Sequence, residues 1–262
     1  MNIFTQTTGN KSVDENPDVV LIHGWGMNGD VWEGILPALT KKHRVTIIDL
    51  PGHGRSLETP HDYTLPKLAA LLANVLPEKS ILVGWSLGGM IATQFTLDYP
   101  QRVNRLALVA SAPQFVKGND WPDGTDKDVL DGFADDLKQN YPQTINRFIA
   151  IQAMGSDFAR EEKRTLRERV FRHGNPQPAA LEGGLDILRR ENLRPRLSEI
   201  NCPCLLIAGE HDALFRRAAA QKTQTLFKHA DLNIIKGAGH APFLSHPDVF
   251  LHSLLPFISH SK

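Results

Sequence analysis

The chain has 262 residues, enough for one large domain or one domain with an insertion. Its 29 basic and 29 acidic residues balance, so no overall charge points to a nucleic-acid or membrane partner, and we expect neither. No signal-peptide pattern and no apolar window of membrane-spanning length is present, so we expect a cytoplasmic protein. The only cysteines, Cys202 and Cys204, are two residues apart on a predicted strand, which suits neither a disulfide nor a complete metal site.

The first part of the chain alternates short apolar runs with helix-like segments. Runs typical of strands buried on both faces lie at residues 19–22, 45–49, 80–83 and 103–109. Helical patterns between them occupy residues 30–42, 65–76 and 90–95. This alternation predicts an α/β fold with a mostly parallel central sheet and helices on both faces.

The strand pattern stops after residue 113 and returns only after residue 192. The intervening helix-like stretches are residues 127–139, 143–154, 158–172 and 178–190. Strands and helices then alternate again at residues 203–208, 216–228, 231–235 and 248–258. We therefore predict an α/β core made of residues 1–113 and 193–262. Residues 114–192 form an inserted helical cap over the carboxyl edge of the sheet, where sites in such sheets lie.

A Gly-x-Ser-x-Gly motif centred on Ser86 joins a predicted strand to a predicted helix. The turn between them is so sharp that it forces Ser86 into a strained conformation, and the glycines allow strand and helix to approach. The serine hydroxyl then projects at the N-terminus of a helix, where developing negative charge is favoured. This context predicts a nucleophilic serine.

A serine nucleophile requires a base and an acid that orients the base. In this type of fold the chain order is serine, acid, histidine. The predicted acid is Asp212, directly after a strand, with Glu210 as a neighbouring carboxylate of the same charge. The predicted base is His240, in the loop after the last strand. Both residues follow strands at the edge of the sheet that carries Ser86.

The loop after the first buried strand has the sequence His-Gly-Trp-Gly at residues 23–26. We expect an oxyanion hole formed by the backbone N–H of Leu87 and a second N–H, that of Trp25, from this loop. Asp49 and the glycine-rich turn at residues 51–56 more often have a structural role, bracing the loops near the serine.

The motifs at residues 23–26, 49–56, 84–89 and 239–243 together resemble the α/β-hydrolase superfamily over essentially the whole chain. The segments 25–32, 84–89 and 240–247 are closely similar to carboxylesterases that cleave the methyl ester of a pimeloyl chain on acyl-carrier protein in biotin synthesis. The resemblance implies an acyl pocket lined by the segment 147–155. It also implies substrate contacts by Trp25, Ser86, Leu87, Phe148, Ile149, Ala150, Ile151, Gln152 and His240.

The resemblance further implies a four-helix cap whose basic surface receives the acidic carrier protein. Six basic and three acidic residues lie between positions 160 and 172, and three of the arginines fall on one helix face. The docking residues would be Arg147, Arg160, Arg164 and Arg167. Gln143 departs from the family pattern, because a further basic residue is expected there.

The reaction inferred from these residues needs no metal and no redox cofactor, and we expect a monomer. Two alternatives share the same triad and cap: a promiscuous short-chain carboxylesterase and a carbon–carbon bond hydrolase. A ligand receptor of the same fold, which binds without turnover, is a third. Dehalogenases and epoxide hydrolases of this fold need a carboxylate nucleophile, which Ser86 excludes.

Overall fold

A computed structural model describes residues 1–9 and 17–259. Its centre is a seven-stranded sheet in the order β1-β3-β2-β4-β5-β6-β7. Only β1 runs antiparallel to its neighbour, so the predicted mostly parallel α/β sheet is confirmed. The strands are β1 (Thr5–Thr8), β2 (Asp18–Ile22), β3 (Val45–Ile48), β4 (Ser80–Trp85), β5 (Val103–Val109), β6 (Cys204–Gly209) and β7 (Ala230–Ile235).

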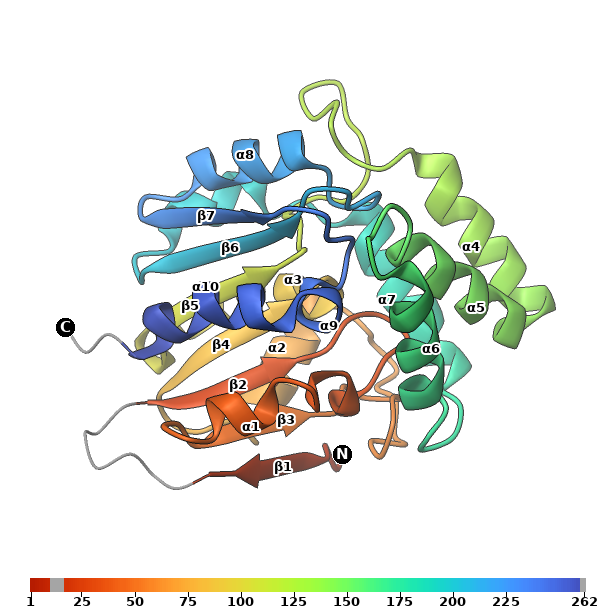
Figure 1. The fold of residues 1–262 in the computed structure, drawn as a ribbon. Helices are drawn as coiled ribbons and strands as arrows, with labels where there is room; N and C mark the ends of the chain where they lie inside the picture. The colour runs from red at the N-terminus through yellow and green to blue at the C-terminus, as the bar shows by residue number, and fades with distance from the viewer. Residues whose placement is uncertain (10–16, 260–262) are drawn as a thin grey trace.

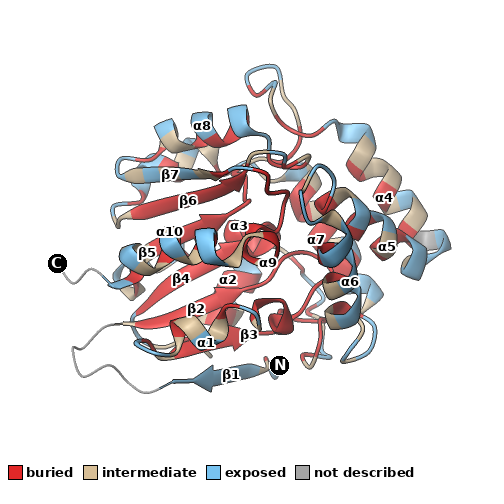
Figure 2. Cartoon of the chain, viewed as in Figure 1, coloured by how far each residue is buried: buried red, intermediate tan, exposed pale blue. Residues whose placement is uncertain are grey.

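Helices cover both faces of this sheet. Figure 1 shows α1 (Leu36–Leu39) and α10 (Pro247–Ser259) on one face, and α2 (Leu65–Ala73) and α3 (Leu87–Asp98) on the other. A further helix, α8 (Arg217–Leu226), packs against β6 and β7. Strands β2, β4 and β6 are buried along their whole length (Figure 2). Their continuous apolar runs follow from this burial on both faces.

Four helices gather at one end of the sheet, at the right in Figure 1. They are α4 (Lys127–Gln139), α5 (Tyr141–Gln152), α6 (Ala159–Val170) and α7 (Pro178–Arg190). Two contacts show which end they cover: the indole N–H of Trp25, after β2, donates to the Leu181 carbonyl of α7, and the backbone N–H of His240, after β7, donates to the Gln152 carbonyl of α5. The helices therefore lie over the carboxyl ends of the strands. The short elements η2 (Pro100–Arg102), η3 (Arg194–Glu199) and α9 (Pro242–Ser245) complete the chain.

Two elements differ from the prediction. The edge strand β1 was not predicted, because its sequence Thr-Gln-Thr-Thr is fully exposed and has no apolar run. The helix expected at residues 30–42 is instead a 3₁₀ turn, η1 (Gly29–Trp32), followed by the single turn of α1. Pro37 lies in the first turn of α1, where its missing N–H is tolerated, but it cannot continue a helix that began at residue 30. Among the described residues, no helix has the length and apolar character needed to cross a membrane.

Candidate active site

Ser86 occupies the turn between β4 and α3 with φ 54°, a left-handed conformation that is uncommon for a residue with a side chain. The flanking glycines leave no room for larger residues. A Cβ on Gly84 would lie 2.5 Å from the Gly88 carbonyl oxygen, and a Cβ on Gly88 would lie 2.4 Å from the His23 carbonyl oxygen. Leu87 is the first residue of α3, so its N–H has no acceptor within the helix. The predicted sharp turn is therefore present.

Asp212 and His240 are paired as the sequence predicts. Nδ1 of His240 lies 2.8 Å from Oδ2 of Asp212, and both side chains are fully buried. The other oxygen, Oδ1, accepts hydrogen bonds from the backbone N–H groups of Leu214 and Phe215. Glu210, the alternative acid, instead accepts a hydrogen bond from the Gly237 N–H at 3.1 Å. Asp212, and not Glu210, is therefore the carboxylate that is paired with His240.

The loop that carries His240 is held beside the serine turn. The indole N–H of Trp85, the residue before Ser86, donates to the His240 carbonyl at 2.8 Å, and the two rings lie 5.8 Å apart. Close approach of the acid and histidine loops requires glycine, since a Cβ on Gly209 would lie 2.0 Å from the Gly239 carbonyl oxygen. Nε2 of His240 is buried and has no hydrogen-bond partner among the described residues. An imidazole fixed at Nδ1 and free at Nε2 is the form that can take a proton from a neighbouring hydroxyl.

Two buried histidines, which the sequence reading did not single out, shape the loop at residues 23–26. Nε2 of His23 accepts a hydrogen bond from the Leu50 N–H at 2.8 Å, so its Nδ1–H donates to the Gly24 carbonyl. Nε2 of His53 accepts from the Gly26 N–H at 3.3 Å. Burial lowers the pKa of His23 to about 4 and the pKa of His53 to about 3. Both rings are therefore neutral braces of the predicted oxyanion loop.

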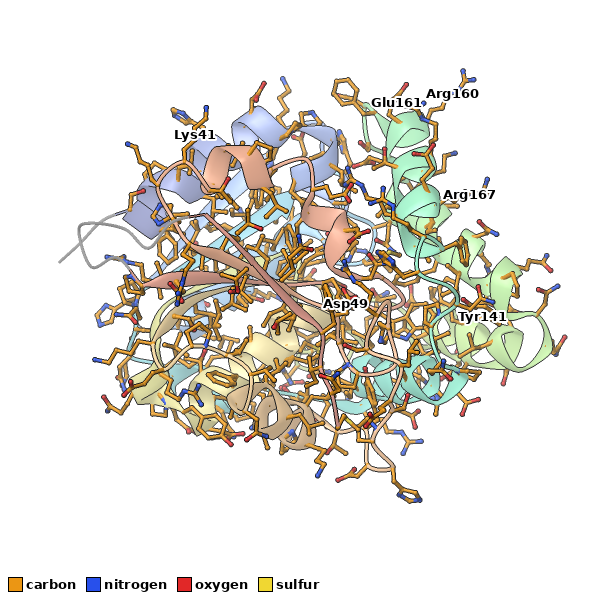
Figure 3. The ribbon with its side chains drawn as sticks, turned by 90° about the horizontal axis from the view of Figure 1, so that it is seen from below. Lys41, Asp49, Tyr141, Arg160, Glu161 and Arg167 are labelled. Atoms are coloured by element: carbon orange, nitrogen blue, oxygen red, sulfur yellow. The ribbon has the colours of Figure 1, made fainter. Side chains whose placement is uncertain are left out.

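Asp49 braces the same region by accepting from backbone and side-chain donors. Its carboxylate receives the Gly29 N–H at 2.7 Å, the Arg55 N–H at 2.8 Å and the Arg55 guanidinium. Burial alone would raise the pKa of Asp49, but the hydrogen bonds from Arg55 and Gly29 bring the net pKa below its usual value. Asp49 is fully buried and is labelled near the middle of the view in Figure 3. These contacts agree with the structural role expected for this motif.

Aromatic rings connect the predicted oxyanion loop to the helices above it. The ring of Phe148 lies 4.7 Å from that of Trp25 and 5.4 Å from that of Phe133, each in an edge-to-face arrangement. Phe148 and its α5 neighbours Ile149 and Gln152 are buried. Ile151 is half-buried, and Ala150 is exposed on the opposite side of α5. The structure therefore places Phe148 and Gln152 against the loops of Trp25 and His240, while the Ala150 side chain faces away from them.

Gln152 combines a backbone contact with an unpaired side chain. Its carbonyl accepts the His240 N–H at 2.9 Å, while its amide nitrogen and oxygen are buried without a partner among the described residues. Unpaired buried amide atoms cost free energy unless another group pairs with them. This side chain can therefore offer both a donor and an acceptor to a ligand next to the histidine loop.

The predicted basic residues lie on the outer surface of α5 and α6. Figure 3 shows Arg160 and Arg167 projecting from the outer side of α6, and Arg164 is also exposed. Arg167 donates to Asn146 at 2.7 Å. Arg147 is half exposed and is paired with Asp136, with its guanidinium 5.1 Å from the Phe133 ring centre. The four arginines share one outer surface, although Arg147 is already engaged with a carboxylate.

No group of three or more histidine, cysteine or acidic side chains suited to hold a metal ion is found in the part of the chain that the structure describes. The site presents a serine in a strained turn, a buried histidine–carboxylate pair and backbone N–H groups. This set can support nucleophilic acyl transfer.

Comparison with known proteins gives concordant findings. Residues 17–247 match the family model of the alpha/beta hydrolase fold. The chain is 44% identical over 245 residues to the pimeloyl-[acyl-carrier protein] methyl ester esterase of Aeromonas hydrophila, covering 93% of this chain and 96% of that protein. It is 39% identical over 250 residues to the protein of the same name from Nitrosomonas europaea, covering 95% and 97%.

Solved structures of lower sequence identity share the same fold. A bromoperoxidase from Bacillus anthracis superposes with a TM-score of 0.89 at 23% identity, covering 98% of this chain and 95% of that one. An esterase from Exiguobacterium antarcticum gives a TM-score of 0.86 at 23% identity, covering 98% and 96%. At this identity the likeness shows the fold alone.

Proposed function

The chain belongs to the alpha/beta hydrolase family, and from this premise we propose that it is a serine carboxylesterase. Its substrate is the methyl ester of pimeloyl-acyl-carrier protein, which it converts to pimeloyl-acyl-carrier protein and methanol in biotin synthesis. The observation that carries the proposal is the buried Asp212–His240 pair beside the Ser86 turn. This pair occurs in a chain that is 38% to 44% identical to relatives named as esterases of that substrate.

The same groups act in both half-reactions. His240 takes the proton of the Ser86 hydroxyl through Nε2 as the serine oxygen attacks the ester carbonyl, while Asp212 holds the imidazole and stabilises its protonated form. The N–H groups of Leu87 and Trp25 receive the oxyanion, and losing one such donor costs roughly 10²–10³-fold in rate. His240 then gives this proton to the methoxy oxygen as the C–O bond of the ester breaks, and methanol leaves. Water, activated by the same histidine, releases the acid.

We propose that residues 114–192 act as a cap on a core formed by residues 1–113 and 193–262. The support is the position of α4–α7 over the carboxyl ends of the strands, with contacts to the loops of Trp25 and His240. The acyl chain would run between cap and core, along Phe148, Ile149 and Ile151, with Gln152 offering its unpaired amide. The exposed Ala150 would contribute no side chain to this path.

The carrier protein would dock on the basic face made by Arg160, Arg164 and Arg167 on α6 and by Arg147 on α5. Support comes from the exposure of the first three arginines and from the name of the relatives, which includes the carrier. Docking there would let the acyl arm pass under the cap, so that the distal methyl ester reaches Ser86 while the thioester remains near the entrance.

We further propose a cytoplasmic monomer. Cys202 and Cys204 are both free thiols, as expected in a reducing compartment. Among the described residues, the exposed large apolar side chains Leu57 and Val249 lie in separate parts of the chain, while Met154 and Phe158 share the connection between α5 and α6. Apolar residues exposed singly need no partner surface.

The proposal is tested by incubating the enzyme with pimeloyl-acyl-carrier protein methyl ester and measuring the mass of the carrier together with released methanol. We expect the carrier to lose its methyl group and to keep its acyl chain, and Ser86→Ala to release no methanol. Cleavage of the thioester, or of a carbon–carbon bond, would assign the site to another hydrolase reaction. One equivalent of product without further turnover would instead indicate a binding protein.

A further inference from the structure

Glu162 in the cap carries a carboxyl that is buried without a hydrogen-bonded partner. The residue lies in the first turn of α6 and is 2% exposed. Neither of its carboxyl oxygens makes a hydrogen bond with any group of the described residues. Buried carboxyls are normally paired, because leaving one unpaired destabilises the fold. A buried unpaired carboxyl is therefore a candidate for a functional role.

Hydrogen bonds and a ring contact hold the segment before Glu162 against the loop that carries His240. The His240 N–H donates to the Gln152 carbonyl, and the Asp157 N–H donates to the Gly237 carbonyl, both at 2.9 Å. The ring of Phe158 lies 5.2 Å from that of His246, and the Glu162 N–H donates to the Phe158 carbonyl. Helix α6 also packs against α9, which begins two residues after His240. Residues 152–162 of the cap and 237–246 of the core therefore form one packed unit.

The charges around Glu162 connect it to the catalytic pair. Burial raises the pKa of the Glu162 carboxyl; the hydroxyls of Ser245 and Ser156 and the charge of His240 oppose the rise, and the charge of Asp212 adds to it. Neither hydroxyl reaches the usual hydrogen-bond distance and angle, so their effect is weaker than that of a formed bond. Electrostatic coupling acts in both directions, so an ionised Glu162 favours the protonated form of His240.

Building on the proposed function, we propose that Glu162 is a positioning residue for His240. From α6, which packs against α9 just after the histidine loop, its carboxylate stabilises the imidazolium that forms when Ser86 attacks the ester. Stabilising a charge that develops during the reaction is most effective in a buried site. Because Glu162 belongs to the cap, the strength of the base then depends on how the cap packs on the core.

The test is the pH dependence of kcat/KM for p-nitrophenyl butyrate in Glu162→Gln, a change that keeps the shape and removes the charge. We expect kcat/KM on the plateau to fall about 3- to 10-fold, and the acid limb to move to lower pH by about half a unit. The melting temperature should stay equal or rise, because a buried unpaired carboxyl is replaced by a neutral group. The matched control is Glu161→Gln, which changes the same charge at the adjacent exposed position on the outer side of α6 (Figure 3) and should leave all three quantities unchanged.

A wild-type pH profile in Glu162→Gln would overturn the proposal. So would a lower kcat/KM with an unshifted acid limb and a lower melting temperature, since that combination describes a structural residue. If the glutamine variant does not fold, Glu162→Asp carries the test: drawing the charge back by one methylene should lower kcat/KM, and a wild-type value would overturn the proposal. Activity retained in Ser86→Ala would contradict the proposed function instead, so the two failures are distinguishable.

Discussion

Ser86 keeps a left-handed backbone conformation that costs about 1–3 kcal/mol elsewhere in proteins. The surrounding structure holds it from two sides. The Ser86 N–H donates to the Val109 carbonyl at 3.0 Å, and the Ser111 hydroxyl donates to the Ser86 carbonyl at 2.7 Å. A Cβ on Gly89 would lie 2.4 Å from the Ser111 side chain, so this packing also depends on a glycine. The strain places the hydroxyl at the helix N-terminus, where an oxyanion is stabilised.

At this scale the first prediction concerns the triad. Ser86→Ala should lower kcat by about 10⁴–10⁶-fold, and adding His240→Ala should lower it little further, because the residues act as one unit. Steady-state rates of both single variants and of the double variant provide the measurement. A second loss that multiplies the first, or near-normal activity in either single variant, would contradict the assignment.

The second prediction concerns pH and the buried histidines His23 and His53. Their folded-state pKa values, about 4 and about 3, lie below the ordinary histidine value of 6.5, so the unfolded chain binds protons first as pH falls. The contribution of each buried histidine to the free energy of unfolding is therefore present above pH 6.5 and is lost as the pH falls toward 4. The loss is about 2 kcal/mol per histidine between pH 6.5 and 5. Urea unfolding of wild type and His53→Gln at pH 7, 6 and 5 measures this. We expect a shallower pH slope in the variant, and an equal slope would contradict the account.

The sequence singles out the candidate triad because motif spacing and chain order are local features. Ser86, Asp212 and His240 each follow a strand, so their convergence at one sheet edge could be predicted. His23, His53 and Glu162 could not be assigned roles in the same way. Their surroundings depend on contacts such as His53 with Gly26 and α6 with α9, which no local pattern encodes.

At the scale of elements, α5 presents Phe148 to the site. Phe148→Ala should impair long-acyl esters more than acetate esters, because only a long chain buries area against this ring. The ratio of kcat/KM for the two esters provides the measurement. Phe133→Ala is the matched control: its ring contacts Phe148 from the cap side, and its loss should reduce stability without changing the ratio. Equal effects of both variants would make Phe148 a core residue only.

A further prediction concerns carrier docking on the outer face of α6. The double variant Arg160→Glu and Arg164→Glu should raise KM for carrier-bound ester about 3- to 10-fold at low salt and less at high salt, because exposed charge pairs are weak and screened. Turnover of p-nitrophenyl butyrate should remain at the wild-type level.

The matched control reverses Lys41 and Lys42, two exposed charges far from the cap; Figure 3 shows Lys41 at the opposite end of the molecule from Arg160. It should not alter KM for the carrier-bound ester. Equal losses for the carrier-bound ester and for p-nitrophenyl butyrate in the α6 variant would assign its arginines to the fold, and no change would remove the physical support for docking there.

Element boundaries followed the sequence where an amphipathic or buried pattern was strong. Helices α4 and α7 begin and end at the predicted residues, and α5 and α6 are each shifted or shortened by about one to two residues at their ends. The polar edge strand β1 and the helix break near Pro37 were not predicted. Strand β1 forms because it pairs with β3, which is distant in the sequence. The break was missed because a proline can either begin a helix or end one.

At the scale of the whole molecule, the alternation of strands and helices predicted the sheet, and the absence of strand patterns between residues 114 and 192 predicted the helices α4–α7. What the pattern could not give is how the insertion sits on the core. That seating arises from single contacts far apart in sequence, such as Trp25 with Leu181 and His240 with Gln152. These same contacts join the proposed oxyanion loop and base to the cap, so the fold of the cap and the chemistry of the site are connected.

We propose that the enzyme recognises an acyl chain presented by a carrier protein, with docking on the cap and ester cleavage at Ser86. The most direct measurement compares kcat/KM for the methyl ester of pimeloyl-acyl-carrier protein with that for free pimelate monomethyl ester at equal concentrations and low salt. The account predicts a higher value for the carrier-bound ester, through a lower KM, and a difference that shrinks as salt is added. Equal values for the two esters, or a preference for the free ester, would contradict it.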